Sequence, residues 1–242
     1  MICGKTLLVF SAHAADYVWR AGGTIAKYVQ EGADVHVVVM SLGVRGESND
    51  LWKIPGQTEQ TVHDTRLKET LAAAKCLGIQ HFEVWDYEDY PLRFDPEREE
   101  RILKKIREVQ PDYIITHDAN DAMNPDHNDL HKAVHACTVQ SCRAGVRIPG
   151  TTATRQMGIF GFEPHQTEIS GFVPDIFIDI TQSFERKVEA MNCFQAQKFM
   201  IQIYTERANL RGNHARRLSG NNQIKYAESF AATYPFVTEE FI

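Results

Sequence analysis

The sequence predicts an α/β fold of the Rossmann-like kind, a single domain with a mostly parallel sheet flanked by helices. Short apolar runs that suit buried strands alternate with longer stretches that suit helices, which is typical of parallel βαβ units. Glycines end two of the helical stretches just before an apolar run, as helix C-terminal caps do. The 242 residues are 43% hydrophobic and can bury a full core, and no linker-like composition divides them. We therefore expect one domain over 1–242.

The elements of the first half alternate strictly along the chain. Gly32 and Gly78 cap the first two helices, and Pro111 stops the third before the fourth strand. The second half is less regular, with strands at 157–162 and 176–180 and a helix at 184–204. In the first half we expect strands at 6–10, 35–40, 81–85 and 113–116, and helices at 17–31, 63–77 and 97–109.

Composition excludes several classes of function. The net charge of -6 argues against a nucleic-acid surface, which needs clustered positive charge. No GxGxxG motif follows the first strand, so a dinucleotide site is not expected. No segment predicts secretion or membrane spanning. The five cysteines are odd in number and contain no CxxC pair, so we interpret them as reduced thiols in a cytoplasmic protein: Cys3, Cys76, Cys137, Cys142 and Cys193.

The best clue to chemistry lies where the first apolar run stops. His13 and Asp16 fall on the predicted strand-to-helix turn, where open α/β sheets place their ligands. His127 follows the fourth strand and should reach the same sheet edge. Imidazole and carboxylate suit a borderline cation such as Zn²⁺, and a catalytic site keeps a further position for water or substrate. We therefore predict a zinc site held by these three residues.

These segments resemble the PIG-L or LmbE-like zinc proteins, which include N-acetylglucosaminyl deacetylases, and the resemblance covers most of the chain. That family carries AHPDD after its first strand and HPDH after a later one, matched here by residues 12–16 and 124–127. By position, His13, Asp16 and His127 match the family's zinc ligands. Ala15, however, stands where the deacetylases have their general-base aspartate, and Asn124 replaces the histidine beside their oxyanion. Both departures remove deacetylase chemistry.

Because the metal ligands are kept while the general base of the deacetylases is missing, we expect a reaction other than deacetylation. Segments 11–16, 19–23 and 43–49 resemble the branch of the family that acts as 4-oxalomesaconate hydratase in gallate and protocatechuate breakdown. The resemblance implies a zinc-dependent hydro-lyase that adds water to a C=C bond of an unsaturated oxo-tricarboxylate. The alternative is a zinc-dependent N-acyl or N-acetylglucosaminyl deacetylase with Glu47 as a substitute base. A third interpretation is a non-catalytic module that binds a metal or a metabolite. The presence of two candidate acid-base side chains argues against it.

Two side chains could supply proton transfer. Glu47 lies in the loop after the second strand, on the same edge as the predicted metal, and would accept a proton from water. His165 lies just beyond the strand that ends near residue 162, and its imidazole can donate or accept a proton near neutral pH. The simpler readings are a solvated glutamate at a glycine-rich turn and a histidine that caps a loop. We predict that both are catalytic.

A tricarboxylate also needs cationic partners, and arginine's planar fork matches a carboxylate. We expect Arg45 and Arg20 beside the metal, Arg155 as a more distant candidate, and Asn124 as a substrate-binding residue. The basic stretch 209–217 is a solvated face, a lid, or a segment that reaches a neighbour's site in a homo-oligomer, and the sequence does not choose among these.

Overall fold

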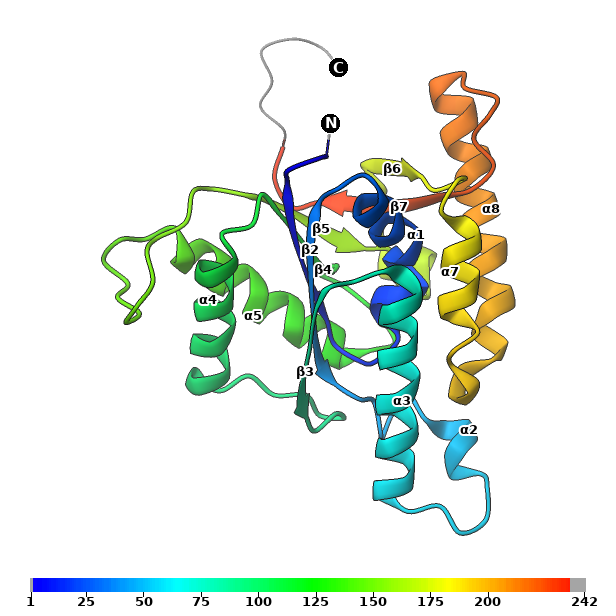
Figure 1. Cartoon of the computed structure of the whole chain (residues 1–242), viewed down its shortest axis with the longest axis horizontal. Helices are drawn as coiled ribbons and strands as arrows, with labels where there is room; N and C mark the ends of the chain where they lie inside the picture. Colours follow the sequence, from blue (N-terminus) through cyan, green and yellow to red (C-terminus); the bar gives the residue numbers. More distant parts are fainter. Residues whose placement is uncertain (1, 236–242) are drawn as a thin grey trace.

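A computed structural model describes residues 2–235 and shows an α/β fold with helices on both faces of one sheet (Figure 1). The strands are Thr6–Ser11 (β1), Asp34–Ser41 (β2), His81–Tyr87 (β3), Tyr113–His117 (β4), Gly158–Phe162 (β5), Ile176–Asp179 (β6) and Ala227–Ala232 (β7). The helices are Asp16–Gln30 (α1), Asn49–Trp52 (α2), Glu59–Leu77 (α3), Pro96–Val109 (α4), Pro125–Ser141 (α5), Thr167–Ser170 (α6), Phe184–Met191 (α7) and Phe199–Ser219 (α8), with a 3₁₀ turn at Gln195–Gln197.

The sheet has seven strands in the order β3-β2-β1-β4-β5-β7-β6. Strands β1 to β5 pair in parallel, and β7 runs antiparallel between β5 and β6. The predicted mostly parallel, Rossmann-like sheet is therefore confirmed. The strand order reverses at β1, which lies between β2 and β4, and such a switch point is where open α/β sheets bind ligands.

Alternate side chains of β1 enter two separate cores, as expected for a strand covered on both faces. Leu7 and Val9 face a core shared with α1, α3, α7 and α8, whereas Leu8 and Phe10 face a core under α4 and α5. Figure 1 shows these two helical layers on opposite sides of the sheet. No helix within residues 2–235 is both long and apolar enough to cross a membrane.

The region predicted as one helix over 184–204 is instead broken. Helix α7 ends at Met191, and Glu69 then accepts hydrogen bonds from the backbone N–H groups of Gln195 (2.7 Å) and Ala196 (3.1 Å), which holds the 3₁₀ turn. Helix α8 restarts at Phe199 and runs to Ser219, so the basic stretch 209–217 is helical. The break arises from a buried carboxylate on α3, which the local pattern does not reveal.

Two further predictions need adjustment. Helix α3 begins at Glu59 rather than near residue 63, because Thr58 and Thr61 form a reciprocal capping box. Strand β7 was not predicted at all, since its sequence AESFAA has few β-branched residues and a central glutamate. The predicted glycine cap at Gly78 is confirmed by its left-handed backbone (φ 77°).

Candidate metal centre and surrounding site

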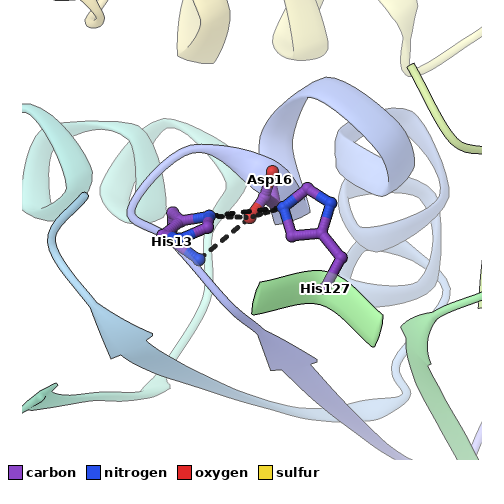
Figure 2. Close-up of side chains that lie close together, drawn as sticks. All are labelled: His13, Asp16 and His127. Carbon is purple, nitrogen blue, oxygen red and sulfur yellow. Dashed lines mark hydrogen bonds and ion pairs between the residues drawn. The ribbon is translucent and has the colours of Figure 1, made fainter. Parts of the chain in front are cut away.

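The β1–α1 turn and the start of α5 place three polar side chains together at the switch point (Figure 2). The backbone N–H of His13 donates to Asp16 Oδ2 (2.9 Å), which fixes the turn. Asn124 and Pro125 open α5, so His127 lies in its first turn. Because β1 and β4 are neighbours, the two segments that follow them meet at the carboxyl edge of the sheet.

The three ligand atoms form a nearly equilateral triangle. His13 Nδ1 lies 3.3 Å from Asp16 Oδ2 and 3.3 Å from His127 Nε2, and His127 Nε2 lies 3.3 Å from Asp16 Oδ2. Bonds of about 2.0–2.1 Å to a tetrahedral ion separate neighbouring donors by about 3.3–3.4 Å. The triangle therefore fits a tetrahedral divalent metal, and all three side chains are buried.

The tautomers of both histidines favour the same interpretation. His127 Nδ1 lies 2.9 Å from Asp121 Oδ2 and His13 Nε2 lies 3.2 Å from Asp126 Oδ2, so each of these nitrogens carries the proton. The nitrogens that face Asp16 therefore carry lone pairs. Three acceptors that point at one another need a cation between them.

The electrostatics of this cluster also attract a positive charge. Burial acts to lower the pKa of His13, but hydrogen bonds with Asp126 and Asp16 outweigh it and raise the pKa to about 10. Burial acts to raise the pKa of Asp16, yet the neighbouring His127 and His117 hold that pKa well below its ordinary value. Without a metal, the cluster retains a proton; with one, the metal supplies the charge.

Glu47 reaches the same site from the loop after β2. Its Oε1 accepts a hydrogen bond from Asn124 Nδ2 (2.9 Å) and lies 3.8 Å from His13 Nδ1. Its Oε2 accepts a hydrogen bond from Gln197 Nε2 (2.9 Å). The structure therefore brings Glu47 and Asn124 together with the three candidate ligands.

His165 lies beyond β5, near the same group of charges. Burial lowers the pKa of His165, and the cations Arg20 and Arg207 lower it further, so the imidazole is neutral near pH 7. Its Nδ1 is buried and has no hydrogen-bond partner within residues 2–235. A buried, unpartnered imidazole nitrogen is suited to meeting a ligand.

The three predicted arginines have different surroundings. Arg20 is buried, with Nε 3.5 Å from Asp16 Oδ1 and Nη1 3.5 Å from Asp121 Oδ2, so it supports the candidate metal centre. The Arg45 guanidinium points to Glu59 (3.5 Å) and Glu88 (3.3 Å), so within residues 2–235 its ion pairs are with these two glutamates and not with the three candidate ligands.

Arg155 requires a correction. Its guanidinium pairs with Asp112, which also accepts the N–H of Thr6 at the start of β1. This is the amino edge of the parallel strands, opposite the candidate metal centre. Because Arg155 precedes β5 rather than following it, its place in the sequence already indicated that edge, and it is not a residue of this site.

Besides Asp121 and Asp126, sequence reasoning missed three further neighbours of the centre. His117, at the end of β4, accepts the N–H of Ala12 at Nε2 (3.0 Å) and stacks on His127 with ring centroids 3.8 Å apart. Burial and the charge of His127 hold the pKa of His117 well below its ordinary value. Its position directly after an apolar strand was an available signal.

Tyr90 and Gln197 are the other two neighbours that the sequence reasoning missed. The Tyr90 ring stacks on His13 (5.8 Å between centroids), and Gly46 leaves room for that ring, since a Cβ at Gly46 would lie 2.1 Å from it. Gln197 comes from the 3₁₀ turn before α8. Tyr90 follows β3, the parallel neighbour of β2, so its position after a strand was again an available signal, whereas Gln197 approaches through tertiary packing.

The fold and this cluster define a Rossmann-like α/β protein with a buried candidate metal centre of two histidines and one aspartate. Residues 8–138 match the PIG-L family, described as GlcNAc-PI de-N-acetylase. The chain is also 39% identical over 239 residues to a 4-oxalmesaconate hydratase of Pseudomonas putida, a match that covers 97% of this chain and 92% of that relative. The chain belongs to the PIG-L family.

Two further comparisons show the range of its relatives. The crystal structure of GalB, the 4-carboxy-2-hydroxymuconate hydratase from Pseudomonas putida, is similar with a TM-score of 0.94 and 38% identity, covering 98% of this chain and 100% of that one. A probable N-acetyl-alpha-D-glucosaminyl L-malate deacetylase 2 of Bacillus anthracis is 25% identical over 195 residues, covering 80% of this chain and 81% of that relative. Hydratases and deacetylases thus share this family.

Proposed function

We propose that this protein is a zinc-dependent hydratase that converts 4-oxalomesaconate to 4-carboxy-4-hydroxy-2-oxoadipate, in gallate and protocatechuate 4,5-cleavage in the cytoplasm. One observation carries the proposal: the Glu47 carboxylate lies 3.8 Å from His13 in the candidate metal centre, while position 15 holds an alanine. The site thus has an acid-base group, but not at the deacetylase position. The two similar hydratases of Pseudomonas putida support the choice of substrate.

His13, Asp16 and His127 would hold the zinc ion, since their facing atoms are lone-pair donors at tetrahedral spacing. When bound, zinc supplies Lewis-acid stabilisation of negative charge on substrate oxygens. Asp121 and Asp126 orient the two imidazoles, and Arg20 supports Asp16 and Asp121.

Glu47 and His165 would move the protons. Glu47 Oε1 accepts a proton from water as the hydroxyl group adds to the C=C bond. The neutral imidazole of His165 moves a proton between the enol oxygen and the α-carbon of the oxo acid. The addition leaves an enolate, Glu47 gives its proton to the enolate oxygen, and His165 moves that proton on to the α-carbon, so one water is added and Glu47 is again a carboxylate.

Among the residues expected from the sequence, Arg20 would meet a carboxylate of the substrate and Asn124 a hydroxyl group. Arg20 keeps its positive charge, although Asp16 and Asp121 already neutralise part of it. The side chain of Asn124 has a buried Oδ1 without a hydrogen-bond partner in the described part of the chain, which leaves it available to a hydroxyl group of a ligand.

Deacetylation is the alternative, supported by the Bacillus anthracis relative. Ala15 has no proton-transfer group and is buried at the start of α1. Asn124 cannot supply the imidazole expected beside an oxyanion, and its amide is already engaged with Glu47. Loss of a general base costs about 10²–10⁴-fold in rate, so acetate release should be negligible.

The deciding experiment supplies both substrate classes to the purified protein, with and without a metal chelator. We expect metal-dependent consumption of 4-oxalomesaconate and no acetate from N-acetylglucosaminides, and elemental analysis should find one zinc per chain. A His13→Ala, His127→Ala double variant should lose that zinc. Acetate release at about 1 s⁻¹ or faster would establish the alternative instead.

A further inference from the structure

Both oxygens of the Glu47 carboxylate are held by neutral amide groups from distant parts of the chain. Asn124 Nδ2 donates to Oε1 and Gln197 Nε2 donates to Oε2, each over 2.9 Å. Oε1 is the oxygen near His13 Nδ1, at 3.8 Å. The carboxylate therefore has one oxygen toward the candidate metal centre and the other tied to the turn before α8.

The orientation of the Gln197 amide is determined by a buried cation. An amide's oxygen and nitrogen ends are similar in shape, so a neighbour of known polarity must distinguish them. Arg66 has only N–H donors, and its Nη2 lies 3.2 Å from Gln197 Oε1. The oxygen end of Gln197 must face Arg66, which directs the NH₂ end toward Glu47.

Arg66 is itself rigidly placed. It is completely buried, its Nε donates to the carbonyl of Leu42 (3.1 Å), and its Nη1 donates to Glu69 Oε2 (2.9 Å). The other oxygen of Glu69 accepts the backbone N–H groups of Gln195 and Ala196, which fixes the turn that carries Gln197. One carboxylate thus anchors both the cation and the amide.

We propose that Gln197, oriented by Arg66, is a positioning residue that holds Glu47 with Oε1 toward the reacting water. Gln197 touches neither the three candidate metal ligands nor, in this role, the substrate; it acts through Glu47. The inference rests on the proposed function, because it assigns Gln197 to the side chain that takes the proton from water. Displacing a catalytic group by about 1 Å can cost about 10²-fold in rate.

The test uses Gln197→Glu and Gln197→Met in the zinc-loaded, full-length protein. Gln197→Glu keeps an acceptor for Arg66 and nearly the same shape, but it replaces the amide donor with a second carboxylate that repels Glu47. Gln197→Met removes the donor without adding charge. We expect both variants to lower kcat for 4-oxalomesaconate by about 10- to 100-fold and to keep KM within about threefold of wild type. The zinc content and the Tm of Gln197→Glu should be unchanged.

Gln202→Glu is the matched control. Gln202 Nε2 also donates to a glutamate, Glu206 (2.8 Å), but on the exposed surface of α8. This variant makes the same chemical change away from the site and should leave kcat unchanged. A crystal structure of Gln197→Glu should show the Glu47 carboxylate rotated away from His13.

The outcomes separate the two proposals. Wild-type protein without hydratase activity would overturn the proposed function. Active wild type, with both Gln197 variants retaining wild-type kcat, would overturn the positioning role alone. Loss of bound zinc in Gln197→Glu would also overturn it, since the fall in kcat would then follow from the missing metal. A rise in KM without a fall in kcat would assign Gln197 to substrate binding instead.

Discussion

At the scale of single residues, the carboxylates beside the histidines determine how the site meets a metal. Asp126 contacts His13 and Asp121 contacts His127, so each imidazole presents its lone pair to the centre. Asp126 also accepts the backbone N–H groups of Tyr90 and Leu92, both at 2.9 Å. One side chain therefore positions a candidate ligand and the loop that covers it.

Metal affinity should depend on pH through His13. The pKa of His13 in the metal-free protein is raised to about 10, so a proton must leave whenever metal binds below that pH. We expect apparent zinc affinity to rise about tenfold per pH unit between about pH 6.5 and 9, measured by competition with a chromophoric chelator and corrected for its own protonation. An affinity independent of pH would show that His13 is not a ligand.

The raised pKa of His13 also affects the stability of the metal-free fold, which should fall as the pH rises, whereas zinc affinity increases. A folded-state pKa above the unfolded value of 6.5 stabilises the fold fully below about pH 6.5, and this contribution is lost as the pH rises through about 10. Urea unfolding of chelator-treated protein should therefore show stability falling on the alkaline side, where zinc binding strengthens.

Glu47→Gln should keep the fold and the metal but lower the hydration kcat by about 10²-fold or more, because an amide cannot accept a proton from water. His165→Ala should likewise act mainly on kcat. Arg45→Ala is a useful comparison, since the Arg45 side chain pairs with the exposed Glu59 and Glu88. A Glu47→Gln enzyme with near-wild-type kcat would leave Glu47 as a polar loop residue.

The sequence predicted residues that directly follow parallel strands far better than those that approach from elsewhere. His13, Asp16, Glu47 and His127 follow β1, β2 and β4, so strand order alone brings them to one edge. It could not predict the direction of the Arg45 guanidinium, which depends on where Glu59 and Glu88 lie. The sequence could not predict Gln197 as a residue of the site, because its position depends on tertiary contacts with Glu69 and Arg66.

At the scale of elements, α8 packs unusually closely on the segment before β7. A Cβ at Gly212 would lie 2.1 Å from the backbone oxygen of Lys225. In the same helix, Arg211 pairs with Glu163 through two hydrogen bonds of 2.8 and 2.6 Å. The basic stretch 209–217 therefore contributes packing and ion-pair contacts to the fold, which its charge pattern alone did not indicate.

Gly212→Ala should reverse the usual preference for alanine in helices. Alanine favours a helix by about 1 kcal/mol over glycine, but forcing a methyl group against backbone costs about 1–3 kcal/mol. We expect a net loss in the free energy of unfolding in urea. Gly145→Ala is the control, since a Cβ there meets nothing within 4 Å. Equal stability of the two variants would show that α8 can shift without cost.

At the scale of the whole molecule, one buried carboxylate on β7 joins that strand to both α1 and α7. Glu228 accepts the backbone N–H groups of Gly23 (2.9 Å) and Thr24 (2.7 Å) and pairs with Lys187 of α7 at 2.6 Å. Lys187 Nζ also donates to the carbonyl of Trp19 (2.8 Å). Side chains from two distant elements thus bind backbone groups of the helix that carries Asp16.

Removing one partner of this pair should be costly. Glu228→Gln leaves the Lys187 ammonium buried and unpaired, for which a loss of about 3–5 kcal/mol in the free energy of unfolding is typical. Glu185→Gln, on the exposed side of α7, should change stability by less than about 0.5 kcal/mol. Denaturant titration of zinc-loaded protein would measure both, and a small effect of Glu228→Gln would show that water reaches Lys187.

The attachment of β7 to α1 has a consequence for synthesis on the ribosome. All three candidate ligands have been synthesised once residue 127 is added, yet the helix that carries Asp16 is completed by contacts from Glu228, which is made much later. Contacts between such distant residues form late, because the intervening chain must first be present and ordered. The nascent polypeptide therefore carries its full set of ligands before it can hold them rigidly, and we expect stable metal binding only after β7 has been made and has packed on α1.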